Sequence, residues 1–312
     1  MEPSVVICAY TEDRWDDTLL AVDSVRGQTS PAHEIILVID HNPALFRRAQ
    51  ASIPGITIVE NNQARGLGGA RNTGIATARG DIVVFLDDDA EAEPDWLQEL
   101  LAGYETDDVA SVGGASIAGW RKGRPGWFPP EFDWVVGCAY VGLPTVTAPV
   151  RNPFGSNMSF RRTALEDLGG FQLGYGCDET ELCIRLHRRW PSSKVMYRPQ
   201  ARVLHKVPAN RGSLRYFVSR CYFEGRSKAV VAWLWGPGDA LASERAYTAR
   251  VLPRGVVRGV GDAVLRRDAS GLGRAAAIVI GFSATALGYL SGSLRVEQAA
   301  RERGFTGLRA PR

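Results

Sequence analysis

Residues 81–89 read Asp-Ile-Val-Val-Phe-Leu-Asp-Asp-Asp, an apolar run that ends in three consecutive carboxylates. Five consecutive apolar residues of this kind predict a buried strand of a mostly parallel sheet, because both faces of such a strand are covered. In open α/β sheets, ligands bind at the carboxyl ends of the strands. Three acids at that position repel one another unless a cation, a helix end or water offsets their charge. The stretch therefore indicates either a metal site or a solvated turn that caps a helix beginning near Pro94.

Apolar runs alternate with helical patterns before this stretch. Strands are expected at residues 4–10, 34–39 and 56–59, and a helix is expected at residues 16–26. This rhythm predicts an α/β fold with a doubly wound, mostly parallel, Rossmann-like sheet over residues 1 to about 110. The polar residues that follow each strand are then expected to meet at one edge of the sheet.

The chain after this region has a different composition. Residues 111–160 are rich in Gly, Pro and aromatic residues, so regular helix is not expected there. Their aromatic side chains either line a pocket or pack as loops against a sheet edge. Two separate strands are expected at residues 195–197 and 201–205, and the second ends at His205. An imidazole at the end of an apolar run is either a structural side chain or a ligand.

Composition and charge place limits on the protein class. The chain of 312 residues has 45% hydrophobic and 23% charged residues, as expected for a globular protein with a large core. The total charge is +3, but residues 240–312 hold 12 Arg, no Lys and 5 acidic residues, about +7, which leaves about −4 elsewhere. Five scattered cysteines favour a reducing cytosol over a disulfide framework. No cleaved signal peptide is expected, because an apolar strand follows the start directly.

The glycine-rich segment at residues 65–74 superficially resembles a dinucleotide-binding fingerprint. Arg71 stands where that fingerprint needs a glycine, and the segment follows the third expected strand, whereas the fingerprint follows the first. Nicotinamide and flavin binding are therefore disfavoured. The segment is instead a basic helix start that faces a diphosphate, or a flexible connection with Arg71 on a solvated face.

Together, these features resemble the family 2 glycosyltransferases, which have the GT-A fold. The resemblance covers residues 4–230, and its motifs follow in order: Ser-Val-Val-Ile-Cys-Ala-Tyr at 4–10, Asp40, the Gly-x-x-x-Ala-Arg-Asn-x-Gly segment at 66–74, Phe-Leu-Asp-Asp-Asp at 85–89, Gly-Ser-Asn-Met-Ser at 155–159 and Asp178-Glu179. It implies a GT-A catalytic domain at residues 1–230 and a basic helical extension at residues 231–312. It also implies inverting transfer of a sugar from a nucleotide diphosphate, a UDP-sugar first of all, with Mn²⁺ or Mg²⁺ as cofactor.

The resemblance also implies roles for individual residues. Glu179 is expected to be the catalytic base, with Asp178 next in line. The expected metal ligands are Asp87, Asp89 and His205. The expected contacts of the nucleotide and its diphosphate are Thr11, Glu12, Asp40, Arg71, Asp87, Asp88 and Arg211. The expected contacts of the acceptor are Ser156, Asn157, Met158 and Trp134.

Two other function classes remain open on the sequence. A nucleotidyltransferase also uses paired acids and Mg²⁺, although it requires a basic glycine-rich loop after the first strand, where this chain is acidic. A sugar- or lipid-binding module without turnover is the other alternative.

The expected acceptor is a hydroxyl or phosphate of a sugar or a lipid-linked molecule, in polysaccharide, glycolipid or polyprenyl-linked sugar assembly. Nucleic acid is not an expected partner, because no nucleic-acid-reading motif accompanies the arginines.

The carboxyl-terminal part indicates a membrane. Residues 275–294 contain no charge over 20 residues, and four arginines flank them. This segment is expected to attach at the interface or re-enter the bilayer, to pack as a buried helical pair, or to span the membrane. The expected location is cytoplasmic and peripheral, on the inner face of the cell membrane.

Overall fold

The computed structural model describes residues 1–172 and 177–302. It divides the chain into two compact units. Unit 1 comprises Met1–Gly119, Pro144–Gly174 and Asp178–Lys206. Unit 2 comprises Trp120–Leu143, Tyr175–Cys177 and Val207–Arg312.

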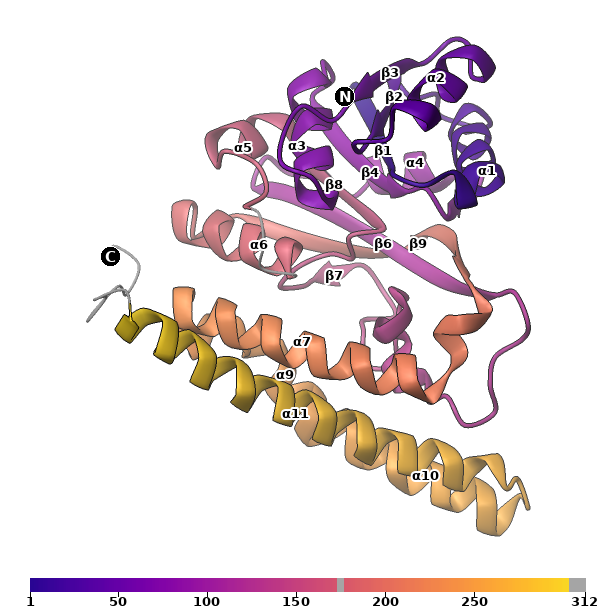
Figure 1. Cartoon of the computed structure of the whole chain (residues 1–312), viewed down its shortest axis with the longest axis vertical. Helices are drawn as coiled ribbons and strands as arrows, with labels where there is room; N and C mark the ends of the chain where they lie inside the picture. Colours follow the sequence, from indigo (N-terminus) through magenta and orange to yellow (C-terminus); the bar gives the residue numbers. More distant parts are fainter. Residues whose placement is uncertain (173–176, 303–312) are drawn as a thin grey trace. The chain divides into compact units, whose positions relative to one another are not determined.

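Unit 1 is built on a mixed sheet (Figure 1). Over the described residues, the sheet order is β3-β2-β1-β4-β8-β6-β9-β5, and β7 pairs with β9. The first four strands in this order run parallel, whereas β8 is antiparallel to both β4 and β6. The strands are β1 (Pro3–Ala9), β2 (Glu34–Ile39), β3 (Thr57–Glu60), β4 (Ile82–Asp87), β5 (Ala90–Ala92), β6 (Val109–Trp120), β7 (Ala148–Pro149), β8 (Asn157–Arg161) and β9 (Lys194–Val207).

Helices cover both faces of this sheet, as the alternation of side chains along β1 requires. Val5 and Ile7 face one core with α1, α2 and α4, whereas Val6 faces the other core with α3, α5 and α6. The expected doubly wound arrangement is therefore confirmed. The helices of unit 1 are η1 (Glu12–Arg14), α1 (Trp15–Arg26), α2 (Pro43–Ser52), α3 (Leu67–Thr77), α4 (Trp96–Leu101), α5 (Arg162–Asp167) and α6 (Asp178–Arg189).

One long strand was not expected, and one expectation about strands is wrong. The Gly-rich region after residue 108 contains the long strand β6, in which Gly113 and Gly114 allow close approach of neighbouring backbone. A Cβ on Gly114 would lie 2.0 Å from the carbonyl oxygen of Ala201. The expected pair of short strands is one continuous strand, β9, because Pro199 interrupts the apolar pattern without ending the strand.

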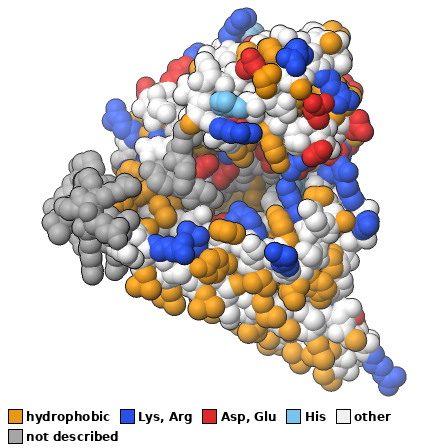
Figure 2. Space-filling view, viewed as in Figure 1, with side chains coloured by type: hydrophobic (Ala, Val, Ile, Leu, Met, Phe, Trp, Pro, Cys, Tyr) orange, Lys and Arg blue, Asp and Glu red, His pale blue; other side chains and the backbone are white. Residues whose placement is uncertain are grey.

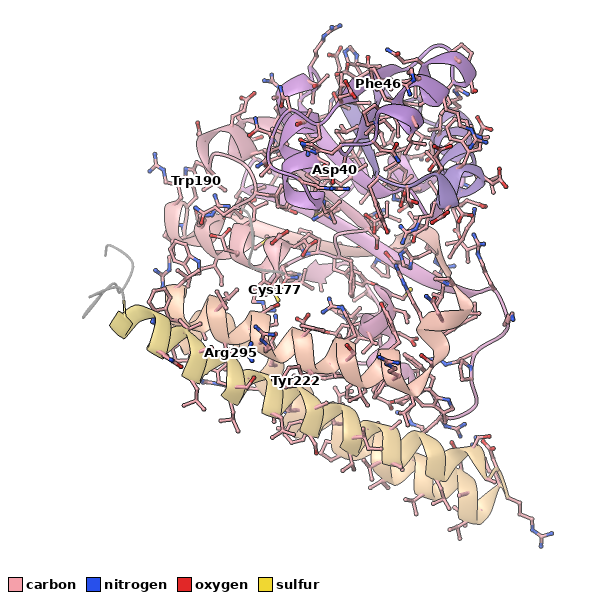
Figure 3. All side chains as sticks on the ribbon, viewed as in Figure 1. Asp40, Phe46, Cys177, Trp190, Tyr222 and Arg295 are labelled. Atoms are coloured by element: carbon pink, nitrogen blue, oxygen red, sulfur yellow. The ribbon has the colours of Figure 1, made fainter. Side chains whose placement is uncertain are left out.

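Unit 2 is helical. Its long helices α7 and α11 pack closely, with Tyr222 on α7 and Arg295 on α11 labelled in Figure 3. The hydroxyl groups of Tyr222 and Ser291 lie 2.6 Å apart between them. The expected domain boundary at residue 230 stays a prediction, and α7 continues across it. The helices of unit 2 are η2 (Pro130–Val136), η3 (Ala209–Gly212), α7 (Leu214–Trp235), α8 (Pro237–Ala240), α9 (Ala242–Ala246), the π-helix η4 (Tyr247–Val251), α10 (Leu252–Leu265) and α11 (Ser270–Glu302).

Candidate active site

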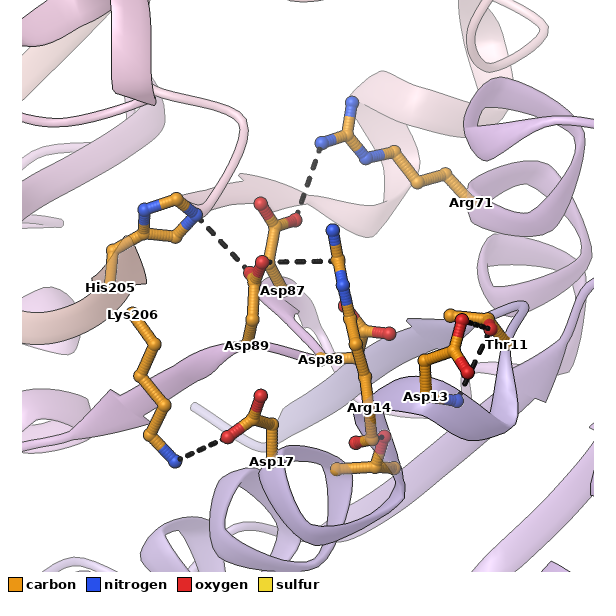
Figure 4. Close-up of polar contacts among 11 residues, drawn as sticks. Thr11, Asp13, Arg14, Asp17, Arg71, Asp87, Asp88, Asp89, His205 and Lys206 are labelled. Carbon is orange, nitrogen blue, oxygen red and sulfur yellow. Dashed lines mark hydrogen bonds and ion pairs between the residues drawn. The ribbon is translucent and has the colours of Figure 1, made fainter. Parts of the chain in front are cut away.

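Two carboxylates and an imidazole gather where β4 ends (Figure 4). Asp87 is the last residue of β4, and the short strand β5 begins directly after Asp89. Because β5 pairs with β9 in the register Ala90 to His205, the imidazole lies beside Asp89, with Nε2 3.2 Å from Oδ1. One ligand atom from each of Asp87, Asp89 and His205 lies within 4.8 Å of the others.

This set of atoms fits a divalent metal ion. Carboxylate oxygens suit Mg²⁺ and Mn²⁺, and an imidazole nitrogen favours Mn²⁺. Burial raises the pKa of Asp87, although Arg71 opposes that shift and Asp89 adds to it. A bound cation would offset the repulsion between these acids. The expected divalent-metal centre is thus present as a ligand set.

A second group of charges lies next to these acids. The guanidinium of Arg14 donates to Asp88 Oδ1 at 2.8 Å and lies 3.1 Å from Asp89 Oδ2 (Figure 4). Burial raises the pKa of Asp88 to about 7, against the attraction of Arg14. Sequence reasoning missed Arg14, although Arg14 lies in the polar turn after the first expected strand, which was expected to meet the end of β4.

Arg71 connects the acid cluster with the acidic start of α6. It donates through Nη1 to Glu179 Oε1 at 2.9 Å and through Nη2 to the Gly155 carbonyl at 3.0 Å. Its Nη2 also lies 3.9 Å from Asp87 Oδ1. Burial disfavours the charged form of Arg71, but Glu179 and Asp87 outweigh that effect and raise its pKa. The expected contact of Arg71 with the nucleotide stays a prediction, whereas its buried position rules out a solvated face.

Gly155 leaves room for the ion pair between Arg71 and Glu179. A Cβ at residue 155 would lie 2.1 Å from Glu179 Oε1 and 2.6 Å from Arg71 Nη2. The turn before β8 therefore supports the ion pair, and any side chain there would displace it. Glu179 keeps 23% of its side chain exposed, so it remains accessible despite the ion pair.

Asp40 organises the loop that follows β3. Its Oδ1 accepts from Asn61 Nδ2 at 2.6 Å, and its Oδ2 accepts from the Gly66 backbone N–H at 2.9 Å. Burial alone would raise the pKa of Asp40, but the hydrogen bonds from Asn61, His41 and Gly66 hold it below its ordinary value. Gly66 has φ +121°, which favours glycine, and it leads directly into α3. Contact of Asp40 with a nucleotide base stays a prediction, and Asn61 is a second residue that sequence reasoning missed.

The other expected nucleotide residues lie in separate places. Thr11 caps η1 by accepting the backbone N–H of Asp13. Glu12 is exposed and pairs with Arg48 at 3.2 Å. Arg211 lies in η3 of unit 2. Their contacts with a nucleotide stay predictions.

The expected acceptor residues before and within β8 lie in buried positions. Met158 and Asn157 are fully buried, and their contacts with an acceptor stay predictions. Met158 packs in a core beside the sheet, and Asn157 accepts from Trp96 Nε1 at 2.8 Å. Ser156 is also buried, and its hydroxyl lies 2.8 Å from that of Ser116. Neighbouring residues of β8 point to opposite faces of the sheet, and both faces are covered, so Asn157 and Met158 are both buried, which the turn motif alone did not indicate.

Two further site residues were expected near these groups. Trp134 lies in unit 2, where its indole N–H donates to the Tyr247 hydroxyl at 3.2 Å. Its contact with an acceptor stays a prediction. Asp178 begins α6, where the helix dipole favours an acid, and its role as a second candidate base stays a prediction.

Comparisons with known proteins agree with this geometry. The sequence profile of Glycosyl transferase family 2 matches residues 4–169. A glucosyl-dolichyl phosphate glucuronosyltransferase from Haloferax volcanii is 35% identical over 247 residues, which are 75% of this chain and 79% of that protein.

Solved structures show the same fold. A mannosyltransferase, PcManGT from Pyrobaculum calidifontis in complex with GDP-Man and Mn²⁺, matches with a TM-score of 0.58 at 20% identity, over 91% of this chain and 87% of that chain. GalNAc-T7 with UDP, GalNAc and Mn²⁺ matches with a TM-score of 0.56 at 19% identity, over 80% of this chain and 51% of that chain. The expected GT-A type of fold is confirmed. The chain belongs to glycosyltransferase family 2, and it is a glycosyltransferase.

Proposed function

We propose that this enzyme transfers a sugar, with inversion, from a nucleoside diphosphate to a lipid-linked acceptor and depends on a divalent metal ion. The observation that carries the proposal is the arrangement at the end of β4. Asp87, Asp89 and His205 form a set of possible metal ligands. Arg71 contacts Asp87 of this set and also pairs with Glu179, which is not part of the set. Leaving-group stabilisation and proton removal therefore have separate side chains.

Glu179 is the proposed base. Its Oε1 accepts from Arg71, and its partial exposure leaves the carboxylate accessible to an acceptor hydroxyl. As that oxygen attacks the anomeric carbon, Glu179 takes its proton, and the bond from the anomeric carbon to the diphosphate oxygen breaks. The nucleoside diphosphate leaves with the electron pair of that bond. Asp178 is the next candidate for the same proton.

The leaving diphosphate requires positive charge. A divalent ion bound by Asp87, Asp89 and His205 would supply Lewis-acid stabilisation of the departing oxygens. Arg14 pairs with Asp88 and with Oδ2 of Asp89. Asp89 Oδ1 lies beside His205 and is therefore the oxygen that would bind the metal ion. Asp40 holds the glycine loop at the start of α3, where backbone N–H groups suit phosphate oxygens.

The proposed acceptor follows from the relative from Haloferax volcanii, whose name describes transfer to glucosyl-dolichyl phosphate. A polyprenyl-linked sugar is therefore the acceptor class to test first, and glucuronic acid is the sugar to test first. We place the enzyme on the cytoplasmic face of the membrane, since a nucleotide-sugar donor is water-soluble and the acceptor is held in lipid. The scattered positions of the cysteines are compatible with this compartment.

A donor panel tests the proposal. Binding and transfer are measured with UDP-glucuronic acid, UDP-glucose, GDP-mannose and dTDP-glucose, with Mn²⁺ or with a chelator, and with a short-chain glucosyl polyprenyl phosphate as acceptor. We expect one UDP-sugar to bind and react only with the metal ion. If no nucleotide sugar binds in either condition, the proposal fails.

Substitution of the proposed base separates chemistry from binding. Glu179→Gln keeps the shape of the side chain but cannot take a proton, so we expect transfer to fall by about 10²- to 10⁴-fold while donor affinity stays within about twofold. The measurements are single-turnover transfer and donor titration. Glu166→Gln, on the exposed surface of α5, is the matched control and should keep wild-type transfer. Full transfer by Glu179→Gln would move the base role to Asp178 or to another residue.

A further inference from the structure

An unusual apolar surface covers the helical hairpin of unit 2. Of the 21 exposed large hydrophobic residues in the described chain, eleven lie in α10 and α11, so exposure is concentrated on these two helices. On α11 seven of them lie between residues 272 and 294, and each is between 39% and 69% exposed. These residues are Leu272, Val279, Ile280, Phe282, Leu287, Leu290 and Leu294. Figure 2 shows hydrophobic side chains gathered over this part of the chain.

Helix α10 continues the apolar surface and adds a charged edge. Val257, Val260 and Val264 are exposed at positions i, i+3 and i+7, which is one helical stripe. Arg250 at the end of η4, and Arg254 and Arg258 of α10, follow four residues apart beside this stripe, and all three are exposed. Arg258 also lies 3.6 Å from Glu131 Oε1. Between residues 250 and 296 the sequence holds seven arginines, no lysine and two acids.

The two acids do not cancel the exposed charge. Asp262 and Asp268 both pair with Arg274, at 3.0 and 2.8 Å, where the turn joins α10 to α11. These pairs hold the turn, and Gly259 and Gly271 allow the two helices to approach there. The arginines along the edge of α10 therefore give the hairpin a positive rim next to its apolar surface. Such a rim is complementary to anionic lipid headgroups.

The packing of α11 opposes a simple transmembrane span. By length and composition alone, Ser270–Val296 is apolar enough to cross a bilayer. However, a Cβ on Gly225 would lie 2.0 Å from the Thr285 carbonyl, and one on Gly288 would lie 2.0 Å from the Tyr222 carbonyl. Helix α11 is thus seated on α7, backbone against backbone.

Helix α7 is unsuited to the hydrocarbon core. It carries five charged residues between positions 215 and 228, and Lys228 pairs with Glu244 at 2.8 Å. If α11 crossed the bilayer with its packing intact, α7 would have to bring these charges with it, at a high cost in free energy. A helix pair that exposes one apolar face and is fixed on the other suits the surface of a bilayer.

We propose that α10 and α11 form an in-plane docking surface for a bilayer that contains anionic lipids. The apolar residues of both helices enter the boundary between headgroups and acyl chains, and the arginines of α10 contact the headgroup phosphates. This inference goes beyond the proposed transfer reaction, because it needs neither donor nor metal. It assigns membrane attachment to a folded face of unit 2, and no transmembrane span is required.

Vesicle binding by the full chain tests the surface. Sedimentation with phosphatidylcholine vesicles, with and without phosphatidylglycerol, should show binding that is stronger with the anionic lipid and weaker at high salt. The pairs V257S/V264S and L287S/L290S should each weaken binding by about tenfold or more, because they remove apolar area from the bilayer contact. The matched control L20S/V146S removes exposed apolar residues of unit 1 and should bind as wild type.

The charged edge has its own pair of variants. R250Q/R254Q should reduce binding to vesicles with phosphatidylglycerol and weaken its salt dependence, whereas R47Q, an exposed arginine of α2, should change neither. All these positions are exposed, so circular dichroism should confirm native folding in each variant. Hydrolysis of a soluble nucleotide sugar should be unchanged, which distinguishes loss of docking from failure of the proposed reaction. Binding of all variants at the wild-type level, or no binding by the wild type, overturns the inference.

Probe depth distinguishes an in-plane helix from a span. A polarity-sensitive fluorophore is attached to cysteine at position 272, 282 or 294 in a Cys8→Ser background, and it is quenched by labels at known depths in the bilayer. An in-plane α11 gives the same shallow depth at all three positions. Greater depth at position 282 than at 272 and 294 would show a span and contradict the proposal.

Discussion

At the scale of single residues, the site depends on cations of the chain that neutralise buried acids. Arg14 contacts Asp88 and Asp89, and Arg71 contacts Asp87 and Glu179. A buried ion pair is weak evidence for stability, but removal of one partner leaves a costly uncompensated charge. These two arginines therefore offset the negative charge of the acids when no metal ion is bound.

Arg14→Gln tests this role. Without Arg14, the acids Asp88 and Asp89 lose their counter-ion, so we expect the metal-free protein to lose roughly 2 kcal/mol or more of unfolding free energy. Mn²⁺ should then raise the melting temperature more in the variant than in wild type, because the metal no longer competes with a guanidinium for Asp89. Thermal unfolding with and without Mn²⁺ measures both effects. Lys194→Gln, which breaks an exposed pair with Asp108, is the control, and an equal Mn²⁺ shift in both proteins would contradict the expectation.

Asp133 gives a pH-dependent prediction. Burial raises its pKa to about 6 in the folded protein, although Arg124 opposes the shift. Between about pH 4 and pH 6 the folded state keeps a proton that the unfolded state loses, so the stability from this group decreases as pH rises through that window. Asp133→Asn cannot titrate. We expect the unfolding free energy of wild type relative to this variant to fall by roughly 2 kcal/mol from pH 4 to pH 7.

Chemical denaturation at several pH values measures that difference. Asp107→Asn, at an exposed position, provides the control for loss of an acidic side chain. A flat profile for the Asp133 difference would show that its carboxyl titrates normally in the folded protein.

At the scale of elements, glycines determine how α7 and α11 pack. Gly225 and Gly288 face backbone atoms of the opposite helix, so these contacts cannot be relieved by rotating a side chain. Neither glycine has an unusual φ, and their role is therefore close approach. This interface supports the surface that we propose for the membrane.

Gly225→Ala should destabilise unit 2, because the added methyl group would require the helices to separate. We expect a loss of about 1–3 kcal/mol, measured by denaturant unfolding followed by near-UV circular dichroism. Gly261→Ala is the matched control, since nothing lies within 4 Å of its added Cβ on α10. It should be neutral or stabilise by about 0.5–1 kcal/mol through helix propensity. Equal effects of the two substitutions would argue against close packing at Gly225.

At the scale of the whole molecule, the two units carry different chemistry. Unit 1 holds the acids, the imidazole and the arginines of the candidate site, whereas unit 2 holds the exposed apolar helices and most of the positive charge near the carboxyl terminus. The family match decides against the nucleotidyltransferase alternative. Donor binding and membrane binding are therefore expected to protect different segments.

Hydrogen exchange measures this division. A UDP-sugar with Mn²⁺ should slow exchange at the ends of β1 and β4 and at the start of α3. Anionic vesicles should instead slow exchange in α10 and α11, since these helices contact the bilayer. The chelated protein with the same donor is the control. Protection of α10 by the donor, or of β4 by the vesicles alone, would contradict the separation of the two functions.

Part of the site was predictable because its signals are local. The acids after β4, Asp40 after β2 and the acidic start of α6 all appear as polar residues at the ends of apolar or helical patterns. The burial of Asn157 and Met158 was not predictable, because a five-residue strand gives no sign of which faces are covered. The long strand β6 was missed for a related reason, since its glycines serve close packing and look like loop signals.

The sequence by itself determined the alternation of strands and helices, the acids at the strand ends and the family, because these depend on patterns within short windows and on motif order. Only the tertiary structure decided which charges meet. His205 reaches Asp89 through the register of β5 on β9, and Arg71 reaches Glu179 across 108 positions of the chain. It also decided which face of α11 stays exposed, because that depends on the fit of α7 against the other face. Long-range pairing depends on packing that no local pattern records.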